Sequence, residues 1–245
     1  MRVAVVQTQP AACRIDANIK AHETWIKKVA VRGADMVFFP ELSLLGYEPK
    51  HAARFALRAD DVRLDVFQML SHALRITIGV GAPTPGNGGV RISMLVFRPD
   101  AARIVYSKQH LHADELPYFV AGDGQVTLTC TGAADDDVVA PAICYESLLD
   151  EHSDAAVALG ATVYAASVAK SAKGIAKADV HYPAIARRHS LRVLMANCVG
   201  PCDDFEAVGG SAIWNARGEL VARLPASGEG ALLLDTARNE TLSIA

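Results

Sequence analysis

The chain has no long apolar run, few cysteines for its length and no signal-peptide pattern at its N-terminus. None of its hydrophobic stretches reaches the roughly 18–20 residues of a membrane-spanning helix, although 51% of its 245 residues are hydrophobic. Residues 1–8 are too short and strand-like for a signal peptide. Five cysteines at irregular spacing do not make a disulfide framework in a chain this long. We therefore expect a reduced, cytoplasmic protein without a membrane partner.

Strong charge and internal repeats are missing as well. The net charge of −3 argues against nucleic acid or an anionic membrane surface as the main partner. There is no low-complexity tract, linker or repeat, and α/β folds of this length commonly form one unit. We expect a single domain over residues 1–245 that acts on a small molecule.

Short apolar runs that predict strands alternate with longer stretches that predict helices. Helices are expected at 17–32, 60–75, 150–160 and 179–189, and the Pro/Gly-rich stretch 83–89 predicts a turn. Strands are expected at 3–8, 35–40, 76–81, 90–97, 103–106, 126–130, 138–143, 162–166, 193–198, 211–214, 219–223 and 231–234. This alternation, with hairpins in between, predicts an α/β fold of mixed β-sheets covered by helices.

Three chemically active side chains, Glu41, Lys108 and Cys144, each follow directly after a predicted strand. Loops at strand ends are where α/β folds usually place their chemistry. A thiol is mostly protonated at neutral pH, so a nucleophilic cysteine needs a carboxylate to take its proton and a cation beside the developing oxyanion. Taken singly, however, Glu41 equally fits a loop acid, Lys108 a surface lysine and Cys144 a small buried hydrophobe.

The segments around these three residues resemble motifs of the nitrilase superfamily, the carbon–nitrogen hydrolases with a Glu–Lys–Cys triad. The matching segments are FFPELS at 38–43, YSKQHL at 106–111 and AICYE at 142–146. They occur in the family's order, and the similarity runs over nearly the whole chain. The resemblance implies a four-layer α-β-β-α sandwich, assembly as a homodimer or a higher homo-oligomer, and no metal or organic cofactor.

The resemblance also assigns roles within an amidase-type reaction. Cys144 would be the nucleophile, Glu41 the general base and acid, and Lys108 the stabiliser of the tetrahedral intermediate. The backbone N–H of Tyr145 would be a second oxyanion donor. The expected reaction hydrolyses the carbon–nitrogen bond of a small carboxamide through a thioester on Cys144, with loss of ammonia or an amine and then of the acid.

Four further residues are expected near the substrate. Glu115 corresponds to the family's second glutamate and would position Lys108 or the substrate amide, with its neighbour Asp114 as the competing candidate. The segment 166–171 borders the pocket in the family, so Ser167 and Lys170 are expected to bind substrate. An ammonium at position 170 suits a substrate carboxylate, although it equally fits a flexible surface lysine. Tyr47 would form an apolar wall.

After the cysteine the chain departs from many amidase-type members. They continue with an arginine and a Phe-Pro-Glu run, whereas this chain reads YESLLDEH at 145–152, in which Glu151 is the match for the later acid. The departure weakens an assignment to the ω-amidase or deaminated-glutathione groups but leaves the triad untouched. A nitrilase or an N-carbamoyl hydrolase with the same triad stays open, as does a catalytically silent binding protein on the same fold.

A second pair of thiols suggests a different chemistry. Cys198 and Cys202 are separated by three residues, and His189 and Asp203 are near in sequence, which would suit a zinc or redox site. Four-ligand zinc sites usually have tighter pairs and a second pair elsewhere, which this sequence lacks. We therefore favour the hydrolase without a metal.

Overall fold

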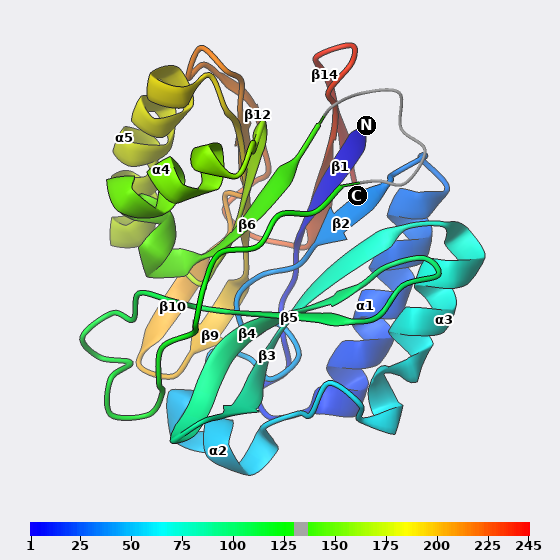
Figure 1. Ribbon diagram of the computed structural model, residues 1–245, viewed down its shortest axis with the longest axis vertical. Helices are drawn as coiled ribbons and strands as arrows, with labels where there is room; N and C mark the ends of the chain where they lie inside the picture. The colour runs from blue at the N-terminus through cyan, green and yellow to red at the C-terminus, as the bar shows by residue number, and fades with distance from the viewer. Residues whose placement is uncertain (130–136) are drawn as a thin grey trace.

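Two β-sheets form the centre of the computed structural model, which describes residues 1–129 and 137–245 (Figure 1). The first sheet has the strand order β14-β13-β1-β2-β3-β4-β5 and the second has the order β12-β11-β8-β7-β6. The first sheet consists of β1 (Arg2–Gln7), β2 (Met36–Phe38), β3 (Thr77–Gly86), β4 (Gly89–Phe97), β5 (Ile104–Ser107), β13 (Gly230–Asp235) and β14 (Glu240–Ile244). The second consists of β6 (Val139–Ile143), β7 (Val163–Val168), β8 (Arg192–Asn197), β11 (Ala212–Trp214) and β12 (Leu220–Arg223).

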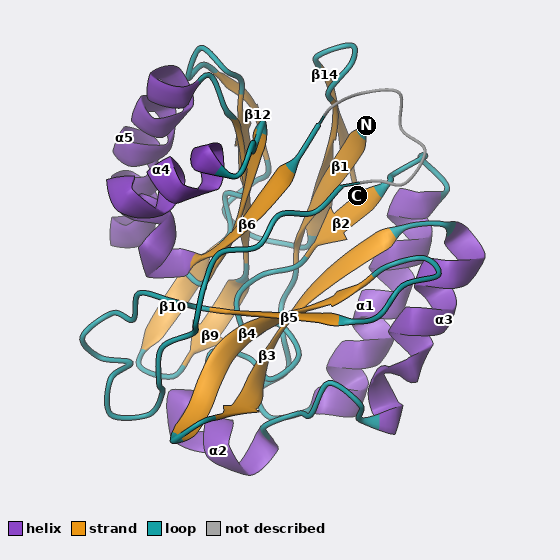
Figure 2. Cartoon of the chain, viewed as in Figure 1, coloured by secondary structure: helices purple, strands orange, loops and turns teal. Residues whose placement is uncertain are grey.

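Helices cover the outer faces of both sheets (Figure 2). The helices α1 (Ile15–Ala30) and α3 (Asp65–Leu74) lie beside the first sheet, and α4 (Asp150–Ala158) and α5 (Ala172–His189) lie beside the second. A short helix, α2 (Ala52–Phe55), and a hairpin of β9 (Val199–Cys202) and β10 (Phe205–Val208) complete the elements around one end of the sandwich. The predicted four-layer α-β-β-α sandwich is confirmed. In the described parts of the chain, no helix is long and apolar enough to cross a membrane.

The apolar run of β7 shows why this sequence folds into two packed sheets. Val163 and Ala165 belong to the core that the second sheet shares with the first, whereas Tyr164 and Ala166 pack into a separate core with α5. Successive side chains of a strand point to opposite faces, so a strand that is covered on both faces must be apolar throughout. Because β6, β7 and β8 are parallel, the residues that follow them meet at one edge.

Two element boundaries differ from the sequence prediction for clear reasons. The helix expected at 179–189 begins seven residues earlier at Ala172, where the Ser171 hydroxyl caps it by accepting the N–H of Gly174 at 3.5 Å. The strand expected at 126–130 is reduced to a single bridge between Leu128 and Val139. Pro141 offers no N–H to continue that ladder. Cys130, at the end of the expected strand, lies outside the described residues.

The predicted turn at 83–89 is mostly strand. The strand β3 continues to Gly86 and pairs with β4 from Gly89 onward. The neighbouring β2 accompanies β3 only over Thr77–Gly79, so the rest of β3 is an edge on that side, and proline is tolerated at sheet edges. The elements α2, β9, β10 and β14 were not predicted. All four are short and lack a long apolar period.

Candidate active site

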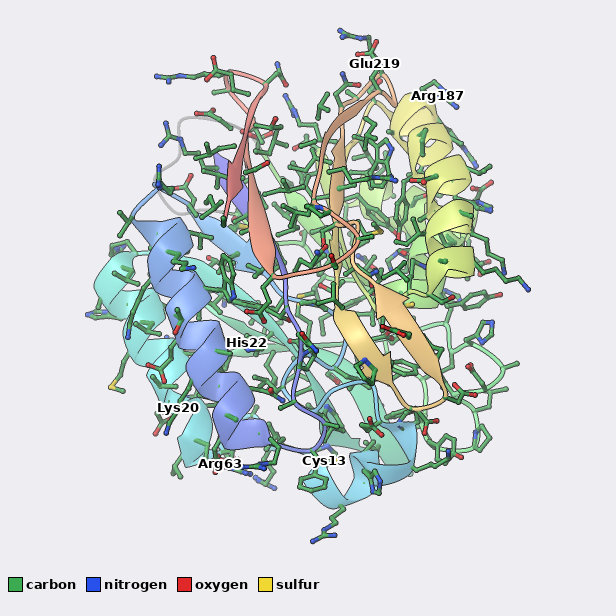
Figure 3. All side chains as sticks on the ribbon, turned by 180° about the vertical axis from the view of Figure 1, so that it is seen from behind. Cys13, Lys20, His22, Arg63, Arg187 and Glu219 are labelled. Carbon is green, nitrogen blue, oxygen red and sulfur yellow. The ribbon has the colours of Figure 1, made fainter. Side chains whose placement is uncertain are left out.

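Glu41 lies in a tight loop that begins just after β2. Two side chains of α1 form hydrogen bonds with this loop. The Asn18 amide donates to the carbonyl of Leu44 at 2.9 Å, and the ring of His22 forms a 2.9 Å hydrogen bond with the hydroxyl of Ser43 (His22 is labelled in Figure 3). Burial lowers the pKa of His22 to about 4, so the ring is neutral in this contact. The carboxylate therefore stands on a loop with a fixed shape.

Gly81 of β3 allows this loop to pack directly against the sheet. A Cβ atom at this position would lie 2.4 Å from the carbonyl oxygen of Pro40 and 2.5 Å from the backbone nitrogen of Leu42. Leu42 itself has a φ of 50°, in the left-handed region that non-glycine residues seldom adopt. The close approach of β3 thus fixes the backbone on both sides of Glu41.

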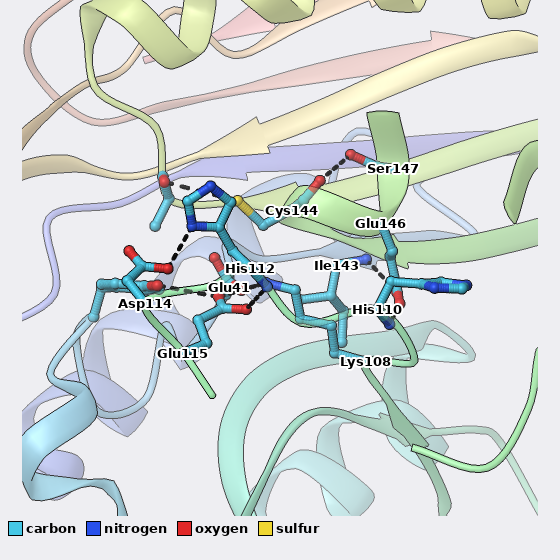
Figure 4. A network of polar contacts seen from close by, with 12 residues as sticks. Glu41, Lys108, His110, His112, Asp114, Glu115, Ile143, Cys144, Glu146 and Ser147 are labelled. Atoms are coloured by element: carbon cyan, nitrogen blue, oxygen red, sulfur yellow. Dashed lines mark hydrogen bonds and ion pairs between the residues drawn. The ribbon is translucent and has the colours of Figure 1, made fainter. Parts of the chain in front are cut away.

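Lys108 follows β5 and is fully buried. Its Nζ donates to Oε1 of Glu41 at 2.8 Å and to Oε1 of Glu115 at 2.6 Å (Figure 4). Glu115 also accepts from the Tyr47 hydroxyl at 3.1 Å and from the backbone N–H of His112 at 2.7 Å. An unpaired buried ammonium is costly, and here two carboxylates share the charge of Lys108.

The structure distinguishes the two candidate acids, Glu115 and Asp114, by their partners. Asp114 is exposed, and its Oδ1 lies 2.5 Å from Nδ1 of His112 rather than on the lysine. Glu115 is buried and contacts the lysine directly. Of the two acids that the sequence offered, Glu115 therefore occupies the position beside Lys108.

Cys144 is the first residue of a short 3₁₀ helix at 144–148 and stands at a sharp turn directly after β6. Its φ of 48° is left-handed, a strained conformation that is often found at functional sites. The Sγ atom lies 3.8 Å from the carbonyl of Ala169 and 4.0 Å from Nζ of Lys170. The first N–H groups of a helical turn have no acceptor within it, so the N–H of Tyr145 can bind a developing oxyanion.

Glu146, whose role the sequence analysis missed, ties the cysteine turn to the segment after the lysine. Its Oε1 accepts from the backbone N–H of Ile143 at 2.8 Å and from the Tyr106 hydroxyl at 2.5 Å. Its Oε2 accepts from the backbone N–H of Gln109 at 2.6 Å (Figure 4 shows Glu146 beside Ile143). The available signal was an acid two positions after the cysteine, where a buried strand ends. Such an acid must find partners because a buried carboxylate is costly alone.

Burial and the neighbouring charges set the protonation of the three central groups. Burial raises the pKa of Glu41 to about 7, with the Lys108 ammonium opposing this shift and Glu115 adding to it. Burial and the Glu41 charge raise the pKa of Cys144 to about 11, against the effects of Lys170 and Lys108. Burial alone would lower the pKa of Lys108, but the negative charges around it raise it. At neutral pH the thiol keeps its proton, and Glu41 is poised to accept one.

One oxygen of Glu41 is left without a hydrogen bond. Its Oε2 is buried and has no partner among the residues that the structure describes, while its Oε1 accepts from Lys108. The Cys144 thiol is close enough to Glu41 to affect its pKa. A buried polar atom without a partner needs an explanation, and a proton acceptor beside a thiol provides one.

A cavity of about 580 Å³ opens over the thiol. Glu41 and Lys108 do not line it, because both are buried behind its wall. Ser167 does not line it either: it lies within β7, is 1% exposed, and its hydroxyl has no hydrogen-bond partner among the described residues. The other expected site residues do line the cavity, namely Tyr47, Glu115, Cys144, Tyr145 and Lys170.

Sequence reasoning missed the rest of the cavity wall. Phe205 of β10 lines the cavity and contacts the ring of Tyr47 edge to face at 5.5 Å. The first turns of α5 line it as well. Neither the hairpin of β9 and β10 nor the start of α5 was predicted, so these residues had no expected place near the cysteine.

The second thiol pair does not extend into a metal site within the described residues. The Sγ atoms of Cys198 and Cys202 are 3.7 Å apart and both residues are buried. His189 bonds instead to Asp154 at 3.0 Å. Across residues 1–129 and 137–245, no three His, Cys, Asp or Glu side chains are grouped to hold a metal ion.

Comparison with known proteins identifies the family. The model of the family described as "Carbon-nitrogen hydrolase" matches residues 2–244. The chain belongs to the carbon-nitrogen hydrolase family. The resemblance that the three sequence motifs indicated is thereby confirmed. Membership also explains why those motifs occur in order along a chain of this length.

An amidase is among the solved structures with the same fold. The NitN amidase from Neterenkonia sp. AN1 is similar with a TM-score of 0.85 and 22% identity, covering 96% of this chain and 92% of that chain. A mutant of the amidase from Nesterenkonia sp. AN1, solved in complex with butyramide, gives a TM-score of 0.86 and 21% identity over 98% and 92% of the two chains. Another mutant of that amidase shows the result of Michael addition of acrylamide at the active site cysteine, with a TM-score of 0.85 and 21% identity over 96% and 92%. At these identities the likeness establishes the fold.

A curated relative is much longer than this chain. It is the glutamine-dependent NAD(+) synthetase of Synechocystis sp., which is 24% identical over 260 residues. The match covers 95% of this chain but 45% of the relative. The chain thus spans less than half the length of that protein.

Proposed function

We propose that this protein hydrolyses the carbon–nitrogen bond of a small carboxamide to the acid and ammonia or an amine. The observation that carries the proposal is the buried contact of Lys108 with both Glu41 and Glu115, beside a thiol that faces a cavity. A base, a cation and a nucleophile in one place are what acyl transfer from an amide requires. The amidases among the solved structures of this fold support the same assignment.

In the first step, Sγ of Cys144 bonds to the amide carbon while Glu41 takes the thiol proton. Because the pKa of the thiol is about 11, the thiolate is not formed in advance and the proton moves as the bond forms. Two of the three N–H donors of Lys108 are occupied by carboxylates, which leaves one for the oxyanion together with the N–H of Tyr145. Glu41 then gives the proton to the nitrogen, the carbon–nitrogen bond breaks, and a thioester remains on Cys144.

In the second step, water attacks the thioester. Glu41 takes a proton from the water, the carbon–sulfur bond breaks, and the same proton returns to the sulfur of Cys144 as the acid leaves. The role of Glu115 is to hold the lysine: it accepts from Lys108, from Tyr47 and from the N–H of His112, so the ammonium cannot turn away. Each residue of the triad is restored at the end of the cycle.

The substrate-binding roles follow from the cavity wall. Tyr47 supplies an aromatic wall, and Lys170 supplies a buried ammonium that suits a substrate carboxylate close to the reacting carbon. The substrate-binding role expected of Ser167 stays a prediction. Its hydroxyl is buried in β7 and does not line the cavity. The homodimer and the cytoplasmic location also stay predictions. An amidase is preferred to a nitrilase or an N-carbamoyl hydrolase because an amidase is among the similar solved structures.

Ammonia release from a panel of substrates tests the proposal. The panel contains simple aliphatic amides, succinamate, glutaramate, carbamoyl amino acids and matching nitriles, with glutamine added because the curated relative is glutamine-dependent. Wild type is expected to release ammonia from at least one amide, and Cys144→Ala from none. Cys13→Ala is the matched control and should behave as wild type, because Cys13 does not line the cavity. Equal activity in Cys144→Ala would overturn the mechanism.

A protein that releases no ammonia from any member of the panel would favour the silent binding protein. Mass spectrometry of the intact chain after mixing with each amide separates this case from slow turnover, because a slow enzyme accumulates an acyl group on Cys144. The absence of both ammonia and acyl adduct would contradict the proposed function.

A further inference from the structure

The first half of α5 forms one wall of the cavity above Cys144. Lys173, Lys177 and His181 all line the cavity and are spaced four residues apart along the helix. Residues four apart share one face of a helix. At a rise of about 1.5 Å per residue, the three extend over roughly 12 Å. We call the two lysines, Lys173 and Lys177, the α5 cation row.

The α5 cation row has no acidic partner within the described part of the chain. Two other charged residues of the same helix are paired: Arg188 bonds to Asp150 and Asp154, and Asp179 bonds to Arg223. An unpaired lysine on an open surface is ordinary, since water solvates it. Several unpaired cations that share the wall of one cavity are different, because their fields add within the enclosed space.

The same wall continues into the buried ammonium of Lys170. This side chain is 5% exposed, and among the described residues the only hydrogen-bond partner of its Nζ is the Sγ of Cys144 at 4.0 Å. The N-terminus of α5, with the cap Ser171, also lines the cavity and contributes the positive end of the helix dipole. A buried cation without a carboxylate is costly to maintain, and an anionic ligand would offset that cost.

The acids around the cavity do not neutralise this wall. The Glu115 carboxylate is occupied by Lys108, by Tyr47 and by the N–H of His112. Asp114 also lines the cavity, but it bonds to the ring of His112 on its own loop rather than to α5. The charges of the α5 wall therefore stay available to a ligand.

The cavity is also larger than a simple amide needs. Its volume of about 580 Å³ lies within the range of about 300–1,000 Å³ that holds whole small-molecule ligands. We infer that the substrate is an elongated amide whose end remote from the scissile bond carries an anionic group, a carboxylate or a phosphate, bound by the α5 cation row. This inference rests on the proposed amide hydrolysis and names the class of its substrate.

Paired substrates test the inference on the whole protein. Each pair joins the monoamide of a linear dicarboxylic acid with its uncharged diamide, from succinic to suberic acid, and a phosphate-ended amide is compared at the best chain length. The ratio of kcat/KM for the charged over the uncharged member should reach about tenfold in the longer pairs, as for one charge-assisted hydrogen bond. The better of the carboxylate and the phosphate then identifies the anion.

The double variant Lys173→Gln/Lys177→Gln should lower this ratio about tenfold toward one. Lys20→Gln is the matched control: Lys20 is an exposed lysine on α1, away from the cavity (Figure 3), and its loss should leave the ratio and the activity unchanged. A ratio near one in wild type, or a ratio that the double variant does not change, would overturn the inference while leaving the amidase in place.

Binding provides a readout that does not need turnover. Calorimetric titration of Cys144→Ala with suberate should show binding that weakens about tenfold when Lys173→Gln/Lys177→Gln is added and that weakens with rising salt. Unchanged binding in the combined variant would contradict the inference. If no amide is hydrolysed by wild type, the proposed function fails, and the titration alone decides whether α5 binds anions.

Discussion

The two buried lysines near Cys144 have opposite surroundings. Lys108 donates to two carboxylates, Glu41 and Glu115, whereas the thiol sulfur of Cys144 is the only hydrogen-bond partner of the Lys170 ammonium among the described residues. Burial acts to lower the pKa of Lys108, yet the carboxylates around it, Glu41 first, raise it. The difference separates two tasks. A lysine that is fully paired before the substrate arrives can orient the reaction, and one that lacks a carboxylate can attract a charged substrate.

Replacing the two lysines by methionine should have opposite effects on stability. Lys108→Met leaves two buried carboxylates unpaired, so the free energy of unfolding should fall by about 3–5 kcal/mol. Its kcat should drop by at least about 10²–10³, as when one oxyanion donor is lost. Lys170→Met removes a buried cation without a carboxylate and should keep or raise stability. Urea unfolding and amide turnover measure both, and a stable, active Lys108→Met would break the comparison.

Substitutions of the two acids in the loop after Lys108 test whether the lysine must be held by a carboxylate. Glu115→Gln should lower kcat about 100-fold, because the amide cannot hold Lys108 by charge as the carboxylate does. Asp114→Asn is the matched control and should stay within about twofold of wild type, since Asp114 contacts His112 and not the lysine. A larger loss in Asp114→Asn than in Glu115→Gln would show that the positions were assigned the wrong way round.

The glycine beside the Glu41 loop tests how closely the base must be held. Gly81→Ala places a methyl group on Pro40 and Leu42, so the free energy of unfolding should fall by about 1–3 kcal/mol, with a loss of kcat. Gly124→Ala is the control, because a methyl group at that position would have no atom within 4 Å. Thermal unfolding and turnover of both variants measure the effect. Equal behaviour of the two variants would mean that the loop can move.

The smallest expected effect is a shift in the pH dependence. Glu41 acts as a base only when deprotonated, and burial raises its pKa to about 7, so kcat/KM should rise with pH through about 7. Glu115 contributes to raising that pKa. Removing its charge in Glu115→Gln should therefore move the rise to lower pH, even though the variant is slow. A rise that stays in place, or moves to higher pH, would contradict the coupling of the two carboxylates.

Much of the site was predictable from the sequence because its parts sit at strand ends. The runs before Glu41, Lys108 and Cys144 are apolar enough to predict buried strands. The motifs around these residues occur in the order that is typical of the family. Their meeting in space was not predictable from spacing, because it depends on how β2, β5 and β6 pack in two different sheets. The motif resemblance supplied that step.

The α5 cation row was not predictable from the sequence for a local reason. The segment 172–178 contains small residues and Gly174, so it lacks the periodic apolar pattern that marks a helix. It becomes helical because Ser171 caps it and because the later part of α5 packs on the second sheet through Tyr182 and Ile185. Tertiary packing thus overrides a weak local helix signal. Because this segment is helical, Lys173 and Lys177 lie in the wall of the cavity.

In the proposed reaction, Cys144 carries the acyl group. Wild-type protein mixed with a turned-over amide, quenched in acid and digested, should show the acyl mass on the peptide that contains Cys144. Peptides with Cys13, Cys198 or Cys202 should stay unmodified. Release of ammonia with the acyl mass on another cysteine, or persistent turnover in Cys144→Ala with no adduct at any time, would contradict the account.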